Sequence, residues 1–196
     1  MSLSIIVLAL VTLQRLGELA LAARNTARLK ARGAVEVGAA HYPLVVLLHA
    51  AWLIGLWLIA RDRPVSLAWL AAFVILQGLR VWVIATLGAR WTTRIIILPG
   101  APLVRRGPYR WIPHPNYAVV VAEIAVLPLA FGLVAYAAVF SMLNAIVLTI
   151  RIRAENQALG ILPALHGEGR DEVRGGVCDP EHGPKSPTRP FGPPSP

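Results

Sequence analysis

Apolar residues in this chain gather in runs long enough to cross a lipid bilayer, and short polar segments separate the runs. The hydrocarbon core of a bilayer is about 30 Å thick, which a helix crosses in about 20 residues. The first three runs match that length, so they predict transmembrane helices at residues 3–23, 43–60 and 65–87.

The last apolar run is too long for one ordinary crossing. Residues 117–150 contain no lysine or arginine, and a single helix of that length would measure about 51 Å. Pro128 and Gly132 fall near the middle and indicate a bend. We therefore expect a helical hairpin with arms at residues 117–131 and 133–150.

Polar residues concentrate in the loop 88–116 between the third span and the hairpin. Its second half, Arg105–Tyr117, reads RRGPYRWIPHPNY, and charged groups of this kind are costly against lipid. Three prolines stiffen that stretch without regular hydrogen bonding. Ile95–Leu98 is short and β-branched, which predicts a strand-like or interfacial segment. The hairpin would return Arg151 to the side of the membrane where this loop lies.

Composition agrees with a membrane protein. The 196 residues are 56% hydrophobic and 15% charged, with a mean hydropathy of +0.61. We expect an all-α integral-membrane bundle of about five transmembrane helices, forming one domain at residues 1–165. Residues 166–196 are rich in proline and glycine and are predicted to be a disordered cytoplasmic tail.

The net charge of +9 lies mainly in short loops that flank apolar runs. That distribution is typical of cytoplasmic membrane flanks, so we expect no nucleic-acid partner. Fifteen of the nineteen basic residues fall on one side of a five-span topology. The chain is therefore predicted to be a multi-pass cell-membrane protein with its N-terminus outside and its loop and C-terminus in the cytoplasm. Neither a zinc spacing nor a phosphate loop is present, and no metal site is predicted.

Several spans carry polar residues that need an explanation. Arg15 and Glu18 lie three residues apart, which favours a self-neutralising pair directed toward the interface over a substrate contact. His49 is interpreted as a residue that hydrogen-bonds between helices, in preference to a catalytic role. Arg80 should face the bundle interior or a wet cavity, or reach the nearer interface.

The hairpin arms carry two further polar residues. Glu123 would be costly at its depth unless it faces protein, so it is a candidate functional residue. Asn144 is expected to hydrogen-bond between the two arms.

Three short motifs resemble the isoprenylcysteine carboxyl methyltransferase superfamily of integral-membrane enzymes, which use S-adenosylmethionine. They are Gly107–Arg110 (GPYR), His114–Tyr117 (HPNY) and, beyond the hairpin, Arg151–Glu155 (RIRAE). Two positions depart from the family pattern: Pro113 stands where arginine is usual, and Asn156 where a second glutamate is common.

The resemblance covers about residues 88–160, and a wider set of residues is similar to a small bacterial branch of the superfamily. Members of that branch are associated with type III polyketide synthases and O-methylate alkylpyrones or phenolic lipids. The resemblance thus implies a lipophilic acceptor entering from the bilayer, contact with membrane lipids, and a polyketide synthase as functional partner. The wider set comprises Arg15, Arg24, Asn25, His41–Pro43, Trp91–Arg94 and Arg151–Asn156.

The resemblance also implies residue roles. Glu155 would bind the cofactor's ribose hydroxyls or ammonium, and a tyrosine would stack on adenine or face the sulfonium. Arg151 would hold the cofactor carboxylate or orient the acceptor. The predicted cofactor-binding residues are Tyr109, His114, Pro115, Tyr117, Arg151 and Glu155, and the predicted catalytic residues are Arg151, His114 and Glu123.

The acceptor chemistry stays open at this point. A hydroxyl acceptor would benefit from a base, with His114, Glu123 and His41 as candidates. A prenylcysteine carboxylate would need only a positive clamp, and a phospholipid amine is a further alternative. More distant alternatives are a membrane lipid reductase with a nicotinamide cofactor and a non-catalytic membrane subunit or binding protein.

Overall fold

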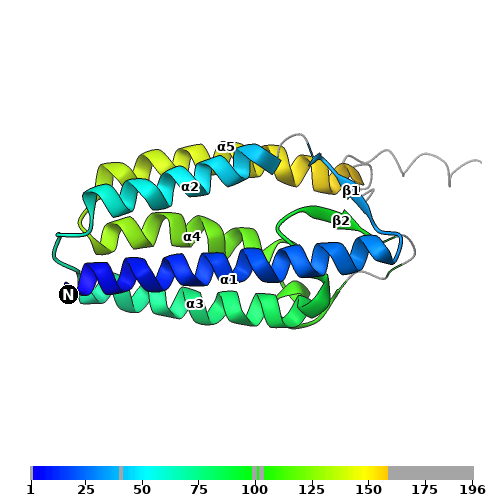
Figure 1. Ribbon diagram of the computed structural model, residues 1–196, viewed down its shortest axis with the longest axis horizontal. Helices are drawn as coiled ribbons and strands as arrows, with labels where there is room; N and C mark the ends of the chain where they lie inside the picture. Colours follow the sequence, from blue (N-terminus) through cyan, green and yellow to red (C-terminus); the bar gives the residue numbers. More distant parts are fainter. Residues whose placement is uncertain (1, 40–41, 99–100, 102–103, 159–196) are drawn as a thin grey trace, which may run out of the picture. The chain divides into compact units, whose positions relative to one another are not determined.

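Five long helices lie side by side and alternate in direction in the computed structural model, within the part it describes, residues 2–39, 42–98, 101 and 104–158 (Figure 1). The start of α1 lies at the opposite end of the bundle from the strands β1 and β2. The helices are α1 (Leu3–Ala31), α2 (Tyr42–Ile59), α3 (Leu67–Leu87), α4 (Pro115–Ala130) and α5 (Val134–Ala158).

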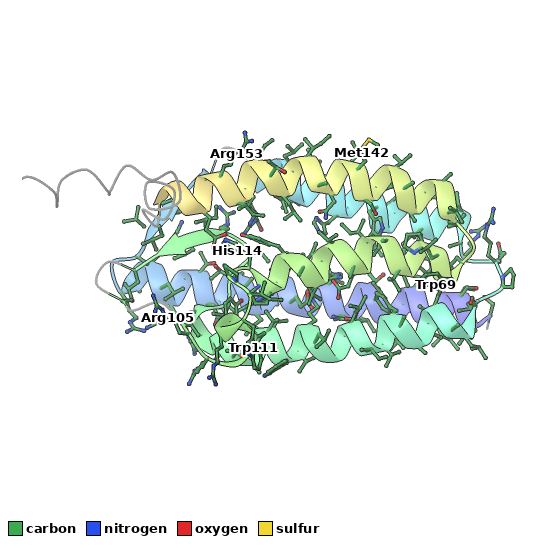
Figure 2. All side chains as sticks on the ribbon, turned by 180° about the vertical axis from the view of Figure 1, so that it is seen from behind. Trp69, Arg105, Trp111, His114, Met142 and Arg153 are labelled. Atoms are coloured by element: carbon green, nitrogen blue, oxygen red, sulfur yellow. The ribbon has the colours of Figure 1, made fainter. Side chains whose placement is uncertain are left out.

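The outside of the bundle is apolar, as a lipid-facing surface must be. Large hydrophobic side chains point outward on α1, α2 and α5, and Leu13, Leu58 and Met142 are 65%, 72% and 69% exposed (Figure 2). Four described helices, α1, α2, α3 and α5, are long and apolar enough to cross a bilayer. The fifth, α4, has 16 residues and spans about 24 Å. These features confirm the predicted all-α integral-membrane architecture.

Helix α1 is longer than the span predicted at residues 3–23. It continues from residue 23 to Ala31 because no helix-breaking residue precedes Gly33, whose φ of +86° ends it. Asn25, only 2% exposed, also fixes this extension. Its amide donates to the backbone carbonyls of Gly88 (3.2 Å) and Trp91 (2.8 Å).

The predicted hairpin is present as α4 and α5. Gly132, with φ of +71°, makes the bend, while Pro128 lies inside the last turn of α4. The arms differ from the expected ranges at their outer ends. Proline is tolerated at a first helical position, so α4 begins at Pro115, and α5 runs to Ala158 and carries the Arg151–Glu155 motif on helix.

A two-stranded antiparallel sheet closes the loop end of the bundle. The predicted strand-like segment is β2 (Ile95–Ile97), and it pairs with β1 (Val35–Val37), which the sequence pattern did not reveal. The register places Glu36 opposite Ile96. Two single-turn 3₁₀ helices, η2 (Gly88–Arg90) and η3 (Gly107–Arg110), complete the described part of the loop.

The hydrophobic core lies toward the other end of the bundle. Trp52 and Leu56 of α2 pack there against Leu8 of α1 and Leu127 of α4, and all four are at most 1% exposed. Burying side chains of this size is worth about 1.5–3 kcal/mol each relative to water. The tightly packed apolar side chains thus lie away from the loop end, where the polar side chains gather.

A buried ionic network joins α1, α3 and α4 at mid-depth. Arg80 donates to both oxygens of Glu18 (2.5 Å each) and to Glu123 (2.7 Å). Arg15 bridges the same two carboxylates at 3.0 and 2.8 Å, and the Gln77 amide donates to Glu123 at 2.9 Å. Two positive and two negative charges therefore compensate one another inside the bundle.

This network corrects one prediction, and it shows where two other predicted polar residues, Arg80 and Glu123, lie. Arg15 and Glu18 do pair, but they point inward instead of toward the interface, because Arg80 and Glu123 supply counter-charges there. Arg80 faces the interior, and it is 6% exposed. Glu123 faces protein and is fully buried.

Among the described residues, the two expected inter-helical hydrogen bonds are not formed. His49 bonds within its own helix, since its Nδ1 lies 2.8 Å from the Val45 carbonyl. Asn144 is 1% exposed, and neither polar atom of its side chain has a hydrogen-bond partner among the described residues. The predicted tail, residues 166–196, lies outside the described residues.

We expect Glu123→Ala to destabilise the protein by about 3–5 kcal/mol, because it leaves two arginines with one buried counter-charge. Glu123→Gln keeps a hydrogen-bond acceptor for Gln77 and should lose less. Val121→Ala on the same helix is the control, since Val121 faces lipid and is 43% exposed. Thermal unfolding in detergent measures the effect, and equal melting temperatures for Glu123→Ala and Val121→Ala would contradict it.

The charge distribution also yields a topology prediction. A reporter active only in the cytoplasm, fused after residue 165, should give signal, because fifteen of nineteen basic residues flank that side. Signal only from a reporter that works outside the cytoplasm would show the opposite orientation.

Candidate functional site

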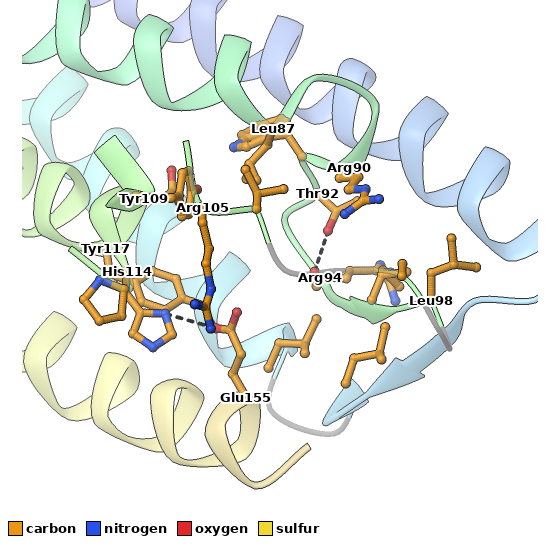
Figure 3. Close-up of a pocket in the computed structure, with 18 of the residues that line it drawn as sticks. Leu87, Arg90, Thr92, Arg94, Leu98, Arg105, Tyr109, His114, Tyr117 and Glu155 are labelled. Carbon is orange, nitrogen blue, oxygen red and sulfur yellow. Dashed lines mark hydrogen bonds and ion pairs between the residues drawn. The ribbon is translucent and has the colours of Figure 1, made fainter. Parts of the chain in front are cut away.

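A cavity of about 940 Å³ lies at the loop end of the described residues. The C-terminal ends of α1, α3 and α5 contribute to its wall, with the loop from Arg90 onward and the first turn of α4 (Figure 3). Five of the six predicted cofactor-binding residues line it: Tyr109, His114, Tyr117, Arg151 and Glu155.

Tyr117 lies at the centre of a hydrogen-bonded chain that connects the two hairpin arms. Its hydroxyl donates to Glu155 and accepts from Arg151 Nε at 2.8 Å. Arg151, which is 7% exposed, also donates through Nη2 to the backbone carbonyl of Thr93 at 2.6 Å. The hairpin thus brings together residues far apart in the sequence, as predicted.

His114 precedes α4 and faces the same carboxylate. Its Nδ1 lies 3.8 Å from Glu155 Oε2, and its ring stacks on Tyr117 with centroids 5.3 Å apart. The carbonyl of His114 accepts from the Tyr117 and Ala118 amides, which starts the helix. Pro115 is buried as the first helical residue, and its fixed φ sets the direction of the following turn.

Tyr109 reaches the cavity from η3. Burial, with a smaller effect from the Glu155 carboxylate, raises the pKa of its phenol well above the ordinary value. The hydroxyl therefore stays protonated at neutral pH. A protonated phenol offers a hydrogen-bond donor and an aromatic face, the two features that a ligand carrying both polar groups and a cation can use.

Strand β2 lines the cavity with Ile95, Ile96 and Ile97, and ionic contacts fix its partner strand β1. Glu36 of β1 accepts from Lys30 (2.6 Å) and from Arg94 (2.5 Å), while the Arg94 guanidinium lies 4.2 Å above the Tyr42 ring. The hydrogen bond from Lys30, and then that from Arg94, hold the pKa of Glu36 below its ordinary value. These bonds connect the end of α1, through Glu36 of β1, to Arg94, the residue before β2.

A second cavity of about 340 Å³ runs between the helices beneath the first. Its lining is mainly apolar and comes mostly from α1 and α2. Some of its lining residues also face outward: Leu16, Leu19, Val46 and Ile54 are 41–59% exposed. The cavity is therefore open sideways, toward the lipid. Five residues line both cavities: Trp91, Thr92, Asn116, Tyr117 and Arg151.

The predicted catalytic residues do not all come together. His114 and Arg151 lie in the first cavity, whereas Glu123 belongs to the ionic network and lines neither cavity. His41, the third candidate base, lies outside the described residues, as does the side chain of Asn156.

Sequence reasoning did not single out two features of the site. Asn116 lines both cavities, and its buried Oδ1 has no hydrogen-bond partner among the described residues. Its place inside the HPNY motif was the available signal. The Thr93 carbonyl that holds Arg151 is a backbone group, for which side-chain patterns give no sign.

Comparisons with known proteins indicate the family of this chain. Residues 69–161 match the model of the isoprenylcysteine carboxyl methyltransferase (ICMT) family, and that range contains both arms of the hairpin and most of the first cavity's wall. An uncharacterized protein of Bacillus subtilis, YpbQ, is 38% identical over 159 residues, which are 79% of this chain and 95% of that protein. The chain belongs to the ICMT family.

A second relative is more distant. An uncharacterized protein of Haemophilus influenzae is 26% identical over 155 residues, covering 76% of this chain and 90% of that protein. No solved structure matches the chain significantly. Membership of the ICMT family identifies the protein as one of a group of membrane methyltransferases, which use S-adenosylmethionine.

Gly107→Ala should weaken this ICMT-family site. Gly107 has φ of +56°, and an added Cβ would lie 2.7 Å from Thr86 Oγ1, so we expect a cost of about 1–2 kcal/mol from the backbone alone. Adding Thr86→Ala should recover part of the loss, because it removes the clash and leaves the strain. Gly17→Ala is the control, since a Cβ there contacts nothing within 4 Å. Thermal unfolding and cofactor titration report both effects, and a fully tolerated Gly107→Ala would contradict this account.

Proposed function

We propose that the protein is an S-adenosylmethionine-dependent methyltransferase of the bacterial membrane that O-methylates a lipophilic acceptor. The acceptor class that we favour is a polyketide-derived lipid, an alkylpyrone or a phenolic lipid, made by a type III polyketide synthase as functional partner. The observation that carries the proposal is that a polar cavity and an apolar, laterally open cavity share one wall.

The first cavity fits the cofactor. Sites for ligands of this size have volumes of about 300–1,000 Å³, which includes the 940 Å³ found here. The Glu155 side chain is 25% exposed and suits the ammonium or the ribose hydroxyls. Arg151 suits the carboxylate, and the stacked pair of His114 and Tyr117 offers an aromatic surface for adenine or the sulfonium.

When bound, the cofactor supplies an electrophilic methyl group on a sulfonium, whose loss leaves a neutral thioether. The protein's own residues then have to align the acceptor and exclude water, and such positioning can account for much of the rate. Tyr117 and Arg151 belong to both cavities, so they are placed to hold the two substrates against each other. Their mutual hydrogen bond of 2.8 Å limits the movement of both side chains.

The second cavity suits the acceptor. Leu16 and Leu19 of α1 and Val46 of α2 form a rim that faces lipid, so an amphiphile can enter from the bilayer without crossing water. Its hydroxyl would lie at the shared wall and its apolar part between the helices. His114 remains the candidate base for that hydroxyl, because it lines the first cavity beside the shared Tyr117.

A prenylcysteine carboxylate is the alternative acceptor, because the family carries that name and Arg151 can serve as a positive clamp. A phospholipid amine would be a further variant of the same reaction. With either acceptor the cofactor site is unchanged, so cofactor binding tests the common part of the proposal.

Calorimetry of the detergent-purified protein should show that S-adenosylmethionine binds and that NADPH does not. Binding of NADPH would instead indicate a reductase. Glu155→Gln should lower the affinity by about one to two orders of magnitude, the equivalent of a charge-assisted hydrogen bond of about 1.5–3 kcal/mol. His114→Ala should also weaken binding, and the two losses should not add, because both residues contact one ligand.

The matched control for charge removal is Asp62→Asn, in an exposed turn of the chain outside both cavities. It should leave the affinity unchanged. Affinity is measured per folded molecule, so a purely structural effect appears as lower yield with normal binding. Wild-type affinity in both Glu155→Gln and His114→Ala would remove the basis for this cofactor site.

A further inference from the structure

The inter-helical cavity is not apolar along its whole length. Arg15, Glu18 and Arg80 of the ionic network line it, together with His49. The side chains of Arg15 and Glu18 stay 17% and 11% exposed, whereas that of Glu123, on the other side of the network, is 1% exposed. The cavity therefore reaches one face of the network, and whatever occupies it contacts charged groups.

His49 adds an unshared lone pair to this polar part. Its Nδ1 lies 2.8 Å from the Val45 carbonyl, and a carbonyl can only accept, so Nδ1 carries the proton. The neutral ring then presents Nε2 to its surroundings as an acceptor. His49 lines the same cavity as Arg15, Glu18 and Arg80 of the network. Its hydrogen bond to Val45 stays within its own helix.

The polar part lies well below the wall that the two cavities share. Tyr42, seven residues before His49 on α2, has its hydroxyl 3.1 Å from that of Thr93 in the site loop. Seven helical residues correspond to about 10 Å. A base must lie within hydrogen-bond reach of the proton it removes, so this separation along α2 argues against His49 as the base for an oxygen at the shared wall.

A hydrocarbon chain would be a poor match for this depth. Polar and charged groups covered by apolar atoms lose hydration without a replacement, and that loss is costly inside a membrane. A hydroxyl would satisfy both neighbours at once, because it can donate to the imidazole and accept from a guanidinium. The lining therefore favours an occupant with an oxygen at this level.

We infer that His49 and Arg15 form a second acceptor subsite, which recognises a hydroxyl group about 10 Å from the oxygen that is methylated. The inference rests on the proposed function and deepens it: the acceptor carries two polar groups, not one polar end on a plain hydrocarbon. His49 is then a specificity-determining residue, and it takes no part in the transfer of the methyl group.

The test uses two probe acceptors, para-butylphenol and the same phenol with a hydroxyl at the end of its butyl chain. The kcat/KM for methylation of each is measured with wild type and with His49→Leu, and the ratio between the probes is compared. Differences in bilayer partitioning are the same for every variant and cancel. The ratio should favour the hydroxylated probe in wild type and fall about tenfold in His49→Leu, the loss of one ordinary hydrogen bond.

Two further variants sharpen the comparison. His49→Gln should retain part of the ratio, because its amide still offers polar atoms at this position. Leu53→Ala, which trims the apolar lining of the same cavity, should lower kcat/KM for both probes and leave the ratio unchanged. Melting temperatures confirm that each variant is folded.

Each other result overturns the inference in a recognisable way. An equal ratio in wild type and His49→Leu would mean that water alone occupies the polar part. An equal loss with both probes in His49→Leu would indicate a catalytic or structural role. If the folded wild type methylates neither probe, the proposal of hydroxyl methylation fails, and this inference fails with it. If both probes are methylated and the ratio is the same in wild type and His49→Leu, only the subsite is disproved.

Discussion

The mutual compensation of four charges inside the bundle, two of them buried, determines where α4 lies. Arg15 and Arg80 share Glu18 and Glu123, so removing any one of them from the bundle would leave an unbalanced charge in a medium that does not hydrate it. Helix α4 is shorter than its neighbours and cannot be positioned by bilayer thickness alone. Glu123 fixes its depth and rotation instead, and the first turn of α4, with Tyr117, follows from that placement.

A second attachment acts at the loop end of the same hairpin. Tyr117 on one arm binds Arg151 and Glu155 on the other, and Arg151 reaches on to the loop after α3. The hairpin is therefore held at two depths, by charges in the middle and by a hydrogen-bonded chain at the end. Side chains held at both ends of a rigid arm keep their geometry without a ligand, as positioning catalysis requires.

The sequence was informative where the determinants are local and weak where they are tertiary. The hairpin followed from the length of residues 117–150 and from Gly132, and β2 from three adjacent isoleucines. The continuation of α1 depended on Asn25 meeting carbonyls more than sixty residues away, and β1 depended on its partner strand. The same limit applies to Glu123: its depth showed that it must face protein, but only the fold revealed that arginines on two other helices surround it.

The two cavities differ in polarity, and the two proposed ligands differ in the same way. A cofactor with three ionised groups is bound only where side chains and backbone replace its water, and Glu155 and Arg151 offer such groups at the loop end. A lipophilic acceptor is concentrated in the bilayer, so its cavity has to open between helices. Chemistry between them can occur only at a boundary where both environments meet, and Tyr117 and Arg151 stand at that boundary. In the proposed function, their polar ends would contact the cofactor, and the acceptor would approach the same two side chains from the apolar cavity.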